Sequence, residues 1–382
     1  MGFHKRIALN NPKTVVVVHY VELPGDRRYP VVIESLAALP AWLERVGLRR
    51  GRLLLVTDEN IARLHLEPLR AALEAAGWTP RVLVLPPGEP TKALPYLERI
   101  YDEALRWGID RRTPVLAFGG GVIGDLAGFA AATLLRGLPL VQMPSTLIAQ
   151  VDSAIGGKTG INHTRGKNLI GAFHQPVLVF ADPSLLQTLP VREWTSGLAE
   201  VVKHALIGDP ALFALLEERW ADVMQRDAAL LPELIGQAVA VKIRVVMQDE
   251  REAGLRAILN FGHTFGHAIE RVAGYGHFTH GEAVALGMLA ALWLSHRRHP
   301  DLPVDRIRTL LQRLPVPGSP DTLDFEALRE AMQVDKKALA GRLRFVLLRR
   351  LGEAYVADDV SEAELRDAWQ FVLESHRATV NS

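Results

Sequence analysis

The chain has 382 residues, 48% of them hydrophobic, which is enough for two domains with sizeable apolar cores. Its 44 basic and 43 acidic side chains give a net charge of +1, so the chain as a whole offers no electrostatic attraction to nucleic acid or to a membrane surface. The absence of cysteine excludes disulfides, thiolate catalysis and cysteine-rich zinc sites, and leaves histidine and carboxylate ligands for any metal.

The first half of the chain alternates between strand and helix patterns. Two β-branched runs, at residues 14–20 and 29–33, predict a strand pair across a turn at 22–28. The succession that follows predicts a parallel sheet with helices on both faces. Its strands are expected at 52–57, 81–85, 115–118 and 140–143, and its helices at 39–46, 60–76, 92–107 and 126–135.

The expected strand at 115–118 runs into a glycine-rich turn that contains Gly-x-Gly-x-x-Gly as Gly119, Gly121 and Gly124. Between a strand and a helix, such glycines let backbone amides approach a pyrophosphate, although the pattern also occurs in tight turns without a ligand. The acid that usually contacts a ribose hydroxyl about 20 residues further on is missing. Asp58 and Glu89, at the ends of other strands, are candidates for that contact, and each would equally suit a helix cap or a solvated turn.

A basic, glycine-rich stretch follows the strand at 140–143. Lysine ammonium groups and free glycine amides both favour phosphate or carboxylate, so the stretch predicts a polar loop that wraps an anionic ligand. An ordinary surface loop would also be glycine-rich and basic, but the length of this one favours the functional interpretation. Its charged and amide side chains include Asp152, Lys158, Arg165, Lys167 and Asn168.

Long helical patterns replace strands in the second half, and we place a domain boundary near Asp182. The first helix, at 191–207, brings Glu200 onto one face with Lys203 and with His204. An exposed ion pair would show the same spacing, but apolar neighbours indicate a mostly buried helix. A buried carboxylate needs a partner, and a cation would be a suitable partner for Glu200.

A cluster of histidines interleaved with glycines follows. His263 and His267 are four apart, so on a helix they share one face, and His280 begins the next apolar helical pattern after a turn. Any one histidine would more often satisfy a buried hydrogen bond, but the group predicts a metal or catalytic cluster. Glu200 with two of the histidines would make the two-histidine, one-carboxylate set of catalytic zinc.

Arg256 and Asn260 precede His263 at helical spacing. The pattern predicts one polar stripe that continues through His267. A polar stripe is usually a solvated face, but the neighbouring glycines and phenylalanines favour a substrate-lined cleft.

Three further features complete the second half. Lys242 lies in an expected helix at 230–249, and a hairpin is expected at 342–348 with 353–356. Lys336 and Lys337 would suit an anion or an ordinary charged turn.

Taken together, these motifs resemble the 3-dehydroquinate synthase family over about residues 58–356. Several independent motifs occur in the family's order. Two small departures are Ser145, where the family usually has Thr, and Ala154-Ile155, where Ser-Val is common. The motifs are Gly-Gly-Gly-Val-Ile-Gly-Asp125, the stretch from Gln150 to Asn168, Leu-Ala-Glu-Val-Val-Lys-His204, Asn-Phe-Gly-His-Thr-Phe-Gly-His267, His280-Gly-Glu and Asp-Lys-Lys337.

The resemblance implies a fold and an activity. The fold would be an α/β Rossmann-like N-terminal domain with a parallel sheet at 1–182, and an all-α C-terminal domain at 183–382. The activity would be that of a lyase of the shikimate pathway, which leads to the aromatic amino acids. It would convert 3-deoxy-D-arabino-heptulosonate 7-phosphate to 3-dehydroquinate and phosphate. The steps would be transient oxidation by NAD, phosphate elimination, re-reduction and intramolecular aldol closure.

The resemblance also implies residue roles, which we carry over by motif. His267 would then act on the substrate or relay protons and would not be a metal ligand. Zn²⁺ or Co²⁺ would bind Glu200, His263 and His280. NAD would contact Asp58, Glu89, Lys92, Gly120, Gly121, Asp125, Ser145, Thr146, Lys158, Lys167 and Thr188. The substrate would meet Arg136, Asp152, Lys158, Asn168, Lys203, Lys242, Arg256, Asn260, His267 and either Lys336 or Lys337.

The nearest alternative is a sibling sugar phosphate cyclase that acts on sedoheptulose 7-phosphate or glucose 6-phosphate. Those substrates lack a carboxylate, so Lys158, Arg256 and Asn260 favour the heptulosonate. A metal-dependent polyol dehydrogenase and a non-enzymatic binding module are more distant alternatives. We expect a sugar phosphate as the small-molecule partner, a homodimer, and neither nucleic acid nor membrane as a partner. The N-terminal residues lack the apolar region of a signal peptide, so we expect a cytoplasmic protein.

Overall fold

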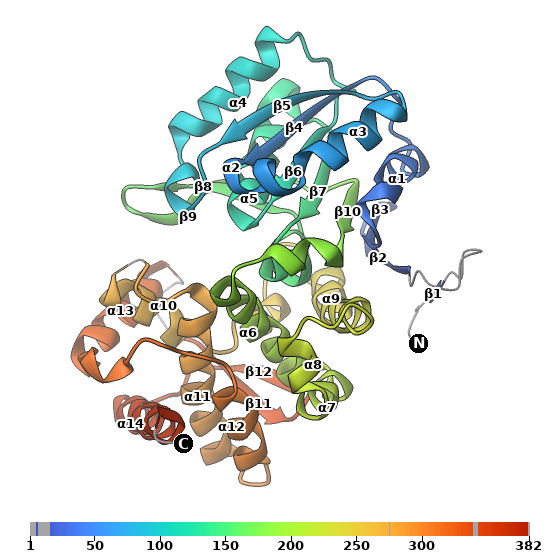
Figure 1. Ribbon diagram of the computed structural model, residues 1–382. Helices are drawn as coiled ribbons and strands as arrows, with labels where there is room; N and C mark the ends of the chain where they lie inside the picture. The colour runs from blue at the N-terminus through green and yellow to red at the C-terminus, as the bar shows by residue number, and fades with distance from the viewer. Residues whose placement is uncertain (1–4, 7–15, 275, 339–342, 381–382) are drawn as a thin grey trace. The chain divides into compact units, whose positions relative to one another are not determined.

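The computed structural model describes residues 5–6, 16–274, 276–338 and 343–380. Its contacts divide the chain into two compact units (Figure 1). Unit 1 comprises residues 1–189 and 226–251, and unit 2 comprises residues 190–225 and 252–382. The sequence predicted a single boundary near residue 182, whereas the contacts return the segment 226–251 to unit 1.

Packing explains why that segment belongs to unit 1. Its helix α9 (Leu231–Gln248) lies against strand β2 (Val17–Leu23). The approach is close at Gly236, where an added Cβ would lie 3.2 Å from Cγ1 of Val17. Arg27 and Glu250 then fix the end of α9 through two hydrogen bonds of 2.8 and 2.6 Å. A boundary drawn from local sequence patterns does not include such long-range contacts.

Unit 1 is built on an eight-stranded sheet of order β1-β2-β3-β10-β7-β6-β4-β5. The strands from β3 to β5 in this order run parallel, which confirms the predicted parallel sheet, and β1 and β2 extend it antiparallel. Strand β10 is an element that the sequence patterns did not single out. The strands are β1 (Lys5–Arg6), β2, β3 (Arg27–Ile33), β4 (Arg52–Asp58), β5 (Thr79–Leu85), β6 (Val115–Gly119), β7 (Leu140–Pro144) and β10 (Leu178–Ala181).

Both faces of this sheet are covered. Successive residues of β4 point to opposite faces, so Leu53 and Leu55 join one core while Leu54 and Val56 join the other. Each expected helix is present, and that at 60–76 has a π-helical turn at Ala62–Leu66. The helices of unit 1 before α9 are α1 (Leu39–Arg45), α2 (Glu59–Ile61), α3 (Glu67–Ala75), α4 (Leu94–Arg106) and α5 (Gly121–Thr133), and 3-10 turns lie at Leu36–Ala38, Glu89–Thr91, Leu134–Arg136 and Pro183–Thr188.

The basic stretch after β7 is not one long loop, so that expectation was wrong. A π-helical turn at Ala149–Ser153 is followed by an antiparallel hairpin of β8 (Lys158–His163) and β9 (Gly166–Phe173). Glycines hold the two strands close, since a Cβ at Gly171 would lie 3.1 Å from Cα of Gly160. Glycines that suggested a ligand-wrapping loop therefore also serve strand pairing.

Unit 2 is helical apart from a two-stranded sheet of β11 (Phe345–Arg350) and β12 (Glu353–Ala357), which confirms the expected hairpin. Helix α11 is buried along most of its length and packs against α6, α10, α12, α14 and β11. Within the described ranges, no helix has both the length and the apolar character needed to cross a bilayer. The helices are α6 (Val191–Gly208), α7 (Pro210–Glu218), α8 (Trp220–Met224), α10 (His263–Ala273), α11 (His280–Arg298), α12 (Val304–Gln312), α13 (Phe325–Ala338) and α14 (Glu362–Val380), with 3-10 turns at Leu255–Asn260 and Pro320–Thr322.

The polar stripe expected from Arg256 to His267 does not form. A 3-10 turn ends at Asn260, and Gly262, with φ +80°, separates it from α10. A side chain is excluded at Gly262 because its Cβ would lie 2.6 Å from Cγ of Met288 on α11. Arg256 is buried while Asn260 is exposed, so the two residues do not share a solvent-facing or cleft-facing stripe.

Candidate metal centre and nucleotide site

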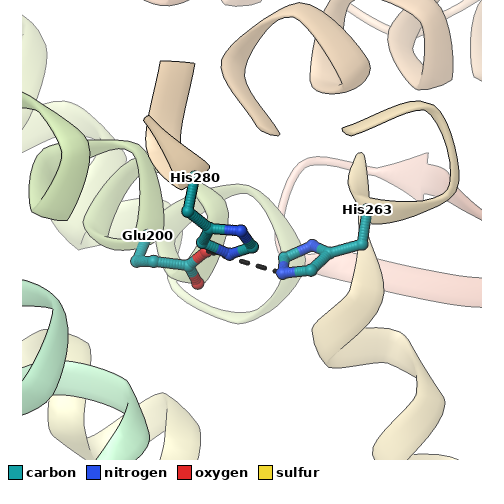
Figure 2. Close-up of side chains that lie close together, drawn as sticks. All are labelled: Glu200, His263 and His280. Carbon is teal, nitrogen blue, oxygen red and sulfur yellow. Dashed lines mark ion pairs between the residues drawn. The ribbon is translucent and has the colours of Figure 1, made fainter. Parts of the chain in front are cut away.

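Three helices of unit 2 bring Glu200, His263 and His280 together (Figure 2). One donor atom from each side chain lies within 4.8 Å of the others. Oε1 of Glu200 is 3.6 Å from Nε2 of His263 and 3.5 Å from Nε2 of His280. Glu200 lies within α6, whereas each histidine begins its helix. Two imidazole nitrogens and one carboxylate form the donor set of catalytic zinc, so this cluster fits a divalent metal ion.

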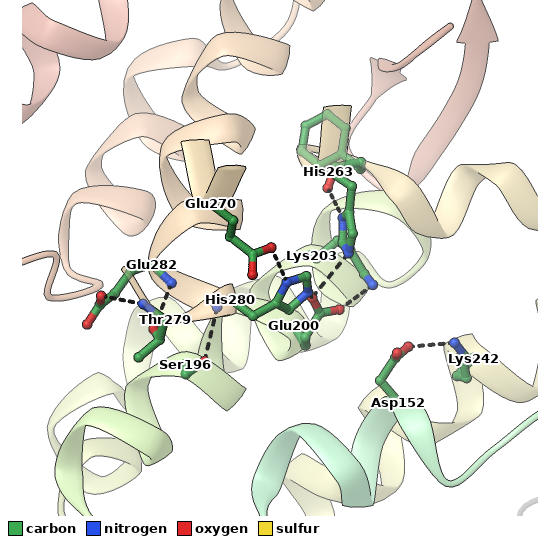
Figure 3. Close-up of polar contacts among 12 residues, drawn as sticks. Asp152, Ser196, Glu200, Lys203, Lys242, His263, Glu270, Thr279, His280 and Glu282 are labelled. Carbon is green, nitrogen blue, oxygen red and sulfur yellow. Dashed lines mark hydrogen bonds and ion pairs between the residues drawn. The ribbon is translucent and has the colours of Figure 1, made fainter. Parts of the chain in front are cut away.

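The remaining ring nitrogens have their own partners, which fix both imidazoles. Nδ1 of His280 lies 3.1 Å from Oε2 of Glu270, and Nδ1 of His263 lies 3.2 Å from the carbonyl oxygen of Phe261 (Figure 3). Metal-binding histidines usually donate their second N–H in this way. Both rings consequently turn Nε2 toward Glu200.

The N-terminus of α11 is held against α6 by the residues that flank His280. Thr279 and Glu282 form a capping box, in which each side chain accepts from the other's backbone N–H. Gly281 donates its N–H to Oγ of Ser196, which lies one turn before Glu200 on α6. A Cβ at Gly281 would lie only 2.5 Å from Cα of Ser196. The absence of a side chain at Gly281 therefore permits the helix approach that brings His280 to Glu200.

The ionisable side chains of the cluster interact strongly with one another and with Lys203. Lys203 donates to Oε2 of Glu200, and both side chains are 1% exposed. Burial lowers the pKa of His263 well below its usual value, which favours the neutral, metal-binding form. At His280 burial opposes the charge, but hydrogen bonds to Glu200 and Glu270 outweigh it and raise the pKa to about 10. A metal ion at Glu200 would compete with a proton for Nε2 of His280.

His267 does not belong to the Glu200 cluster. It is exposed, and its ring centroid lies 5.4 Å from that of His263 and 6.2 Å from that of His280. It falls instead into a second group of potential ligands with Glu270 and His280. The four-residue spacing that suggested a ligand pair therefore brings the two rings near each other, but only His263 faces Glu200.

The other expected substrate residues of unit 2 differ in their surroundings. Arg256 is 1% exposed, and Nδ2 of Asn260 lies 3.5 Å from Oε1 of Glu252. Lys336 and Lys337 lie in α13, but their side chains are outside the described residues.

In unit 1 the glycine turn joins β6 to α5 as predicted, with Gly120 as the N-cap residue. A Cβ at Gly120 would lie 3.1 Å from Cγ2 of Thr146, and one at Gly124 would lie 2.9 Å from Oε1 of Gln142. Gln142 donates to the carbonyl oxygen of Gly124 at 3.0 Å. Gln142 thus lies at the position where the usual ribose-binding acid is missing, and it stabilises the glycine turn. Sequence patterns gave no signal for that role.

Two buried hydroxyls lie at the carboxyl ends of parallel strands, where a polar ligand would satisfy them. Oγ of Ser145, after β7, and Oγ1 of Thr57, in β4, are buried and have no hydrogen-bond partner within the described part of the chain. Such groups are rare in folded proteins. Oδ1 of the neighbouring Asp58 caps α2 at the amides of Asn60 and Ile61, and burial raises the pKa of the carboxyl. The glycine turn and these hydroxyls fit a dinucleotide.

Lys92 links two other expected site residues. Its Nζ donates to Asp125 and, at 2.5 Å, to Oδ1 of Asn168. Burial raises the pKa of Asp125, and the nearby Lys92 opposes that shift. Glu89 accepts a hydrogen bond of 2.7 Å from Asn162 on β8. Asn162 also accepts from the backbone N–H of Asn168 at 2.9 Å, so Glu89, Lys92 and the hairpin form one polar network.

The remaining expected residues of unit 1 are spread over several elements. Helix α9 brings Nζ of Lys242 to 2.6 Å from Oδ1 of Asp152. Oγ1 of Thr188 lies 2.7 Å from Nε2 of His65, a contact across 123 residues that sequence spacing does not reveal. Lys158 is exposed at the start of β8, Lys167 is partly buried in β9, and Arg136 is exposed with φ +68°.

The chain matches known proteins along nearly its whole length. The family model described as 3-dehydroquinate synthase N-terminal matches residues 82–196, and the model described as 3-dehydroquinate synthase C-terminal matches residues 197–338. The 3-dehydroquinate synthase of Salinibacter ruber is 62% identical, with 93% of this chain and 97% of the relative covered. That of Nitrosospira multiformis is 46% identical, with 92% and 97% covered.

Solved structures of sugar phosphate cyclases show the same fold. One is ValA, the 2-epi-5-epi-valiolone synthase of Streptomyces hygroscopicus with NAD⁺ and Zn²⁺ bound, at 32% identity and a TM-score of 0.82, covering 91% of this chain and 97% of that one. Another is 2-deoxy-scyllo-inosose synthase complexed with carbaglucose-6-phosphate, NAD⁺ and Co²⁺, at 26% identity and a TM-score of 0.81, covering 94% and 99%. By its sequence along nearly its whole length and by its fold, the chain belongs to the 3-dehydroquinate synthase family.

Proposed function

We propose that the protein is a 3-dehydroquinate synthase, which converts 3-deoxy-D-arabino-heptulosonate 7-phosphate to 3-dehydroquinate and phosphate with the help of NAD and a divalent metal ion, Zn²⁺ or Co²⁺. The observation that carries this proposal is the high identity, over nearly the whole chain, to relatives that bear this name. The buried carboxylate and histidine cluster supports it independently, because it offers the donor set that the metal requires.

Glu200, His263 and His280 would hold the metal, and the glycine turn with Asp58, Ser145 and Thr146 would hold NAD. When bound, NAD supplies a hydride acceptor that is restored within each turnover, and the metal supplies Lewis acidity at a substrate oxygen. In the proposed reaction there is no net change in the redox state of the cofactor.

The remaining polar residues suit the two anionic ends of the substrate. Arg256 is suited to the carboxylate, because a guanidinium can donate two parallel hydrogen bonds to it. Lys158 and Asn168 are suited to the phosphate, as an ammonium and an amide donor. Lys203 pairs with Glu200, and Lys242 pairs with Asp152. Each ammonium group would donate a hydrogen bond to a substrate oxygen in place of its carboxylate.

Three further parts of the proposal concern partners and surroundings. The ValA and 2-deoxy-scyllo-inosose synthase structures both hold NAD⁺, and the second also holds carbaglucose-6-phosphate, which supports a small-molecule substrate here. We further propose a homodimer with neither nucleic acid nor membrane as a partner, in keeping with the net charge of +1. We also propose a cytoplasmic location, where NAD would be available to the enzyme.

The test is a phosphate-release assay with the heptulosonate phosphate and a catalytic amount of NAD. We expect phosphate release in large excess over NAD, with no net NADH absorbance. Turnover of sedoheptulose 7-phosphate, with no turnover of the heptulosonate phosphate, would identify a sibling cyclase instead. Net NADH production would identify a dehydrogenase, and an absence of released phosphate with either substrate would favour a binding module.

A further inference from the structure

We propose that Glu270 is a positioning residue for the metal centre, whose carboxylate orients the imidazole of His280 so that Nε2 faces Glu200. This inference rests on the proposed metal-binding role of Glu200, His263 and His280. It adds a buried acid that none of the predicted site roles included.

The geometry carries the proposal. Glu270 lies seven residues after His263 on α10, a spacing that puts both side chains on one face, two turns apart. Its side chain is 11% exposed, and Oε2 lies 3.1 Å from Nδ1 of His280. Nε2 of the same ring lies 3.5 Å from Oε1 of Glu200. The two carboxylates therefore contact opposite nitrogens of one imidazole (Figure 3).

Close helix packing makes this arrangement possible. Glu270 is on α10 and His280 is on α11, and the two helices meet at glycines. A Cβ at Gly266 would lie 3.3 Å from the carbonyl oxygen of Ala283, and one at Gly287 would lie 2.9 Å from the amide nitrogen of Gly266. Helix α10 thus supplies one ligand, His263, together with the partner of another ligand.

The chemistry of imidazole gives the contact its consequence. A neutral imidazole has one N–H and one lone pair, so an acceptor at Nδ1 holds the proton there and leaves the lone pair on Nε2. A carboxylate is a stronger acceptor than a backbone carbonyl. His263 has the carbonyl of Phe261 as its acceptor, whereas His280 has Glu270. We therefore expect the ligand strength of His280 to depend on a side chain that can be substituted.

One other role for Glu270 has to be separated from positioning. With His267 and His280 it forms a second group of potential ligands within 4.8 Å of one another. The two roles predict different metal stoichiometries. If Glu270 only accepts from Nδ1 of His280, the chain binds one ion, whereas metal binding by Glu270 requires two ions per chain. Stoichiometry is therefore measured together with affinity.

The test compares the full-length wild type with Glu270→Gln and Glu270→Ala. Zinc affinity is measured by competition with a chelator, and the coordination sphere by the visible absorption of the cobalt-loaded protein. We expect one ion per chain, and a loss of affinity in Glu270→Ala of about 10- to 100-fold, the usual effect of removing such a partner. Glu270→Gln keeps an oxygen acceptor, so we expect a smaller loss of affinity and a cobalt spectrum closer to that of the wild type.

A matched control separates positioning from general destabilisation. Ser295, also buried on α11, donates to the carbonyl oxygen of Ala291 at 2.6 Å and accepts from the amide of Leu348 at 2.9 Å. Ser295→Ala should lower the melting temperature of the metal-free protein and leave the zinc affinity unchanged.

Several results would overturn the inference. Wild-type zinc affinity and an unaltered cobalt spectrum in both Glu270 variants would remove the positioning role, as would two ions in the wild type and one in Glu270→Ala. If the alanine variant does not fold, Glu270→Gln decides the question by the same two measurements. A wild type that binds no zinc would instead refute the proposed metal centre itself, so the two failures are distinguishable.

Discussion

Replacing Gly281 by alanine should separate α6 from α11 and release the metal. The added Cβ would lie 2.5 Å from Cα of Ser196 and 2.6 Å from its carbonyl carbon. Ordinary carbon contacts begin at about 3.4 Å, so the helices must shift by at least about 0.9 Å, and the carbonyl oxygen of Ser196 would lie closer still to the added Cβ. Metal ligands tolerate deviations of only about 0.2 Å. Because Glu200 is one turn from Ser196 and His280 is adjacent to Gly281, the shift should move their donor atoms apart.

We expect the zinc affinity of Gly281→Ala to fall by more than about 100-fold, since losing a ligand should cost more than losing a ligand's partner. Overpacking should also lower the stability by about 1–3 kcal/mol. The measurements are metal content of the purified protein, zinc affinity by chelator competition, and thermal unfolding without metal.

Gly266→Ala is the matched comparison for this experiment. It also adds one methyl group to a glycine in a helix at a helix contact, but its Cβ would lie 3.3 Å from its nearest neighbours, so a shift of a few tenths of an ångström suffices. We expect this variant to keep its metal. Alanine favours helix more than glycine does, so helix propensity cannot explain a loss at Gly281. A Gly281→Ala protein with full metal content and wild-type affinity would refute the argument.

Three more predictions follow from the site and from the ion pair of Arg27 and Glu250 at the end of α9. Glu200→Ala and His263→Ala should each abolish metal retention, as measured by metal analysis of the purified variants, and full metal content in either would contradict the assigned ligands. Lys158→Ala should raise the KM for the heptulosonate phosphate by about 10- to 100-fold, since a charge-assisted hydrogen bond contributes about 1.5–3 kcal/mol, with much less effect on the KM for NAD; equal losses would count against the assigned role. Hydrogen bonding to Arg27 holds the pKa of Glu250 below its usual value, so the stabilisation should be present above about pH 4.3 and be lost as pH falls through the lower, folded-state pKa. Unfolding of Glu250→Gln and the wild type should therefore differ at pH 7 and converge in acid, and a constant difference would argue against the pair.

Local patterns predicted the elements whose signal is local. The apolar run at 52–57 became β4, and the glycine turn at Gly119–Gly124 joins β6 to α5 as expected. The hairpin of β8 and β9 was missed because its glycines resemble those of a ligand loop, whereas their close approach appears only once two strands are paired. The break at Gly262 was missed because the residue that leaves no room for a side chain there, Met288, lies 26 residues away on α11.

The site was predictable to the extent that it follows from motifs. Sequence spacing suggested Glu200 with two histidines, and the resemblance named His263 and His280 as the two that the structure turns toward Glu200. Glu270 could have been found as the residue two helical turns after His263. Gln142 could not, because a glutamine in a buried strand has no distinctive pattern until its contact with Gly124 is known.

The assignment of residues 226–251 to unit 1 has a consequence for synthesis on the ribosome. The nascent sheet emerges long before α9 does, so the side of β2 that α9 covers has no partner until the chain has been translated through residue 251. A fragment that stops at residue 189 would carry that apolar surface permanently, and we expect it to aggregate or to recruit a chaperone. The first unit can therefore complete its fold only after residues 190–225 of the second unit have been translated.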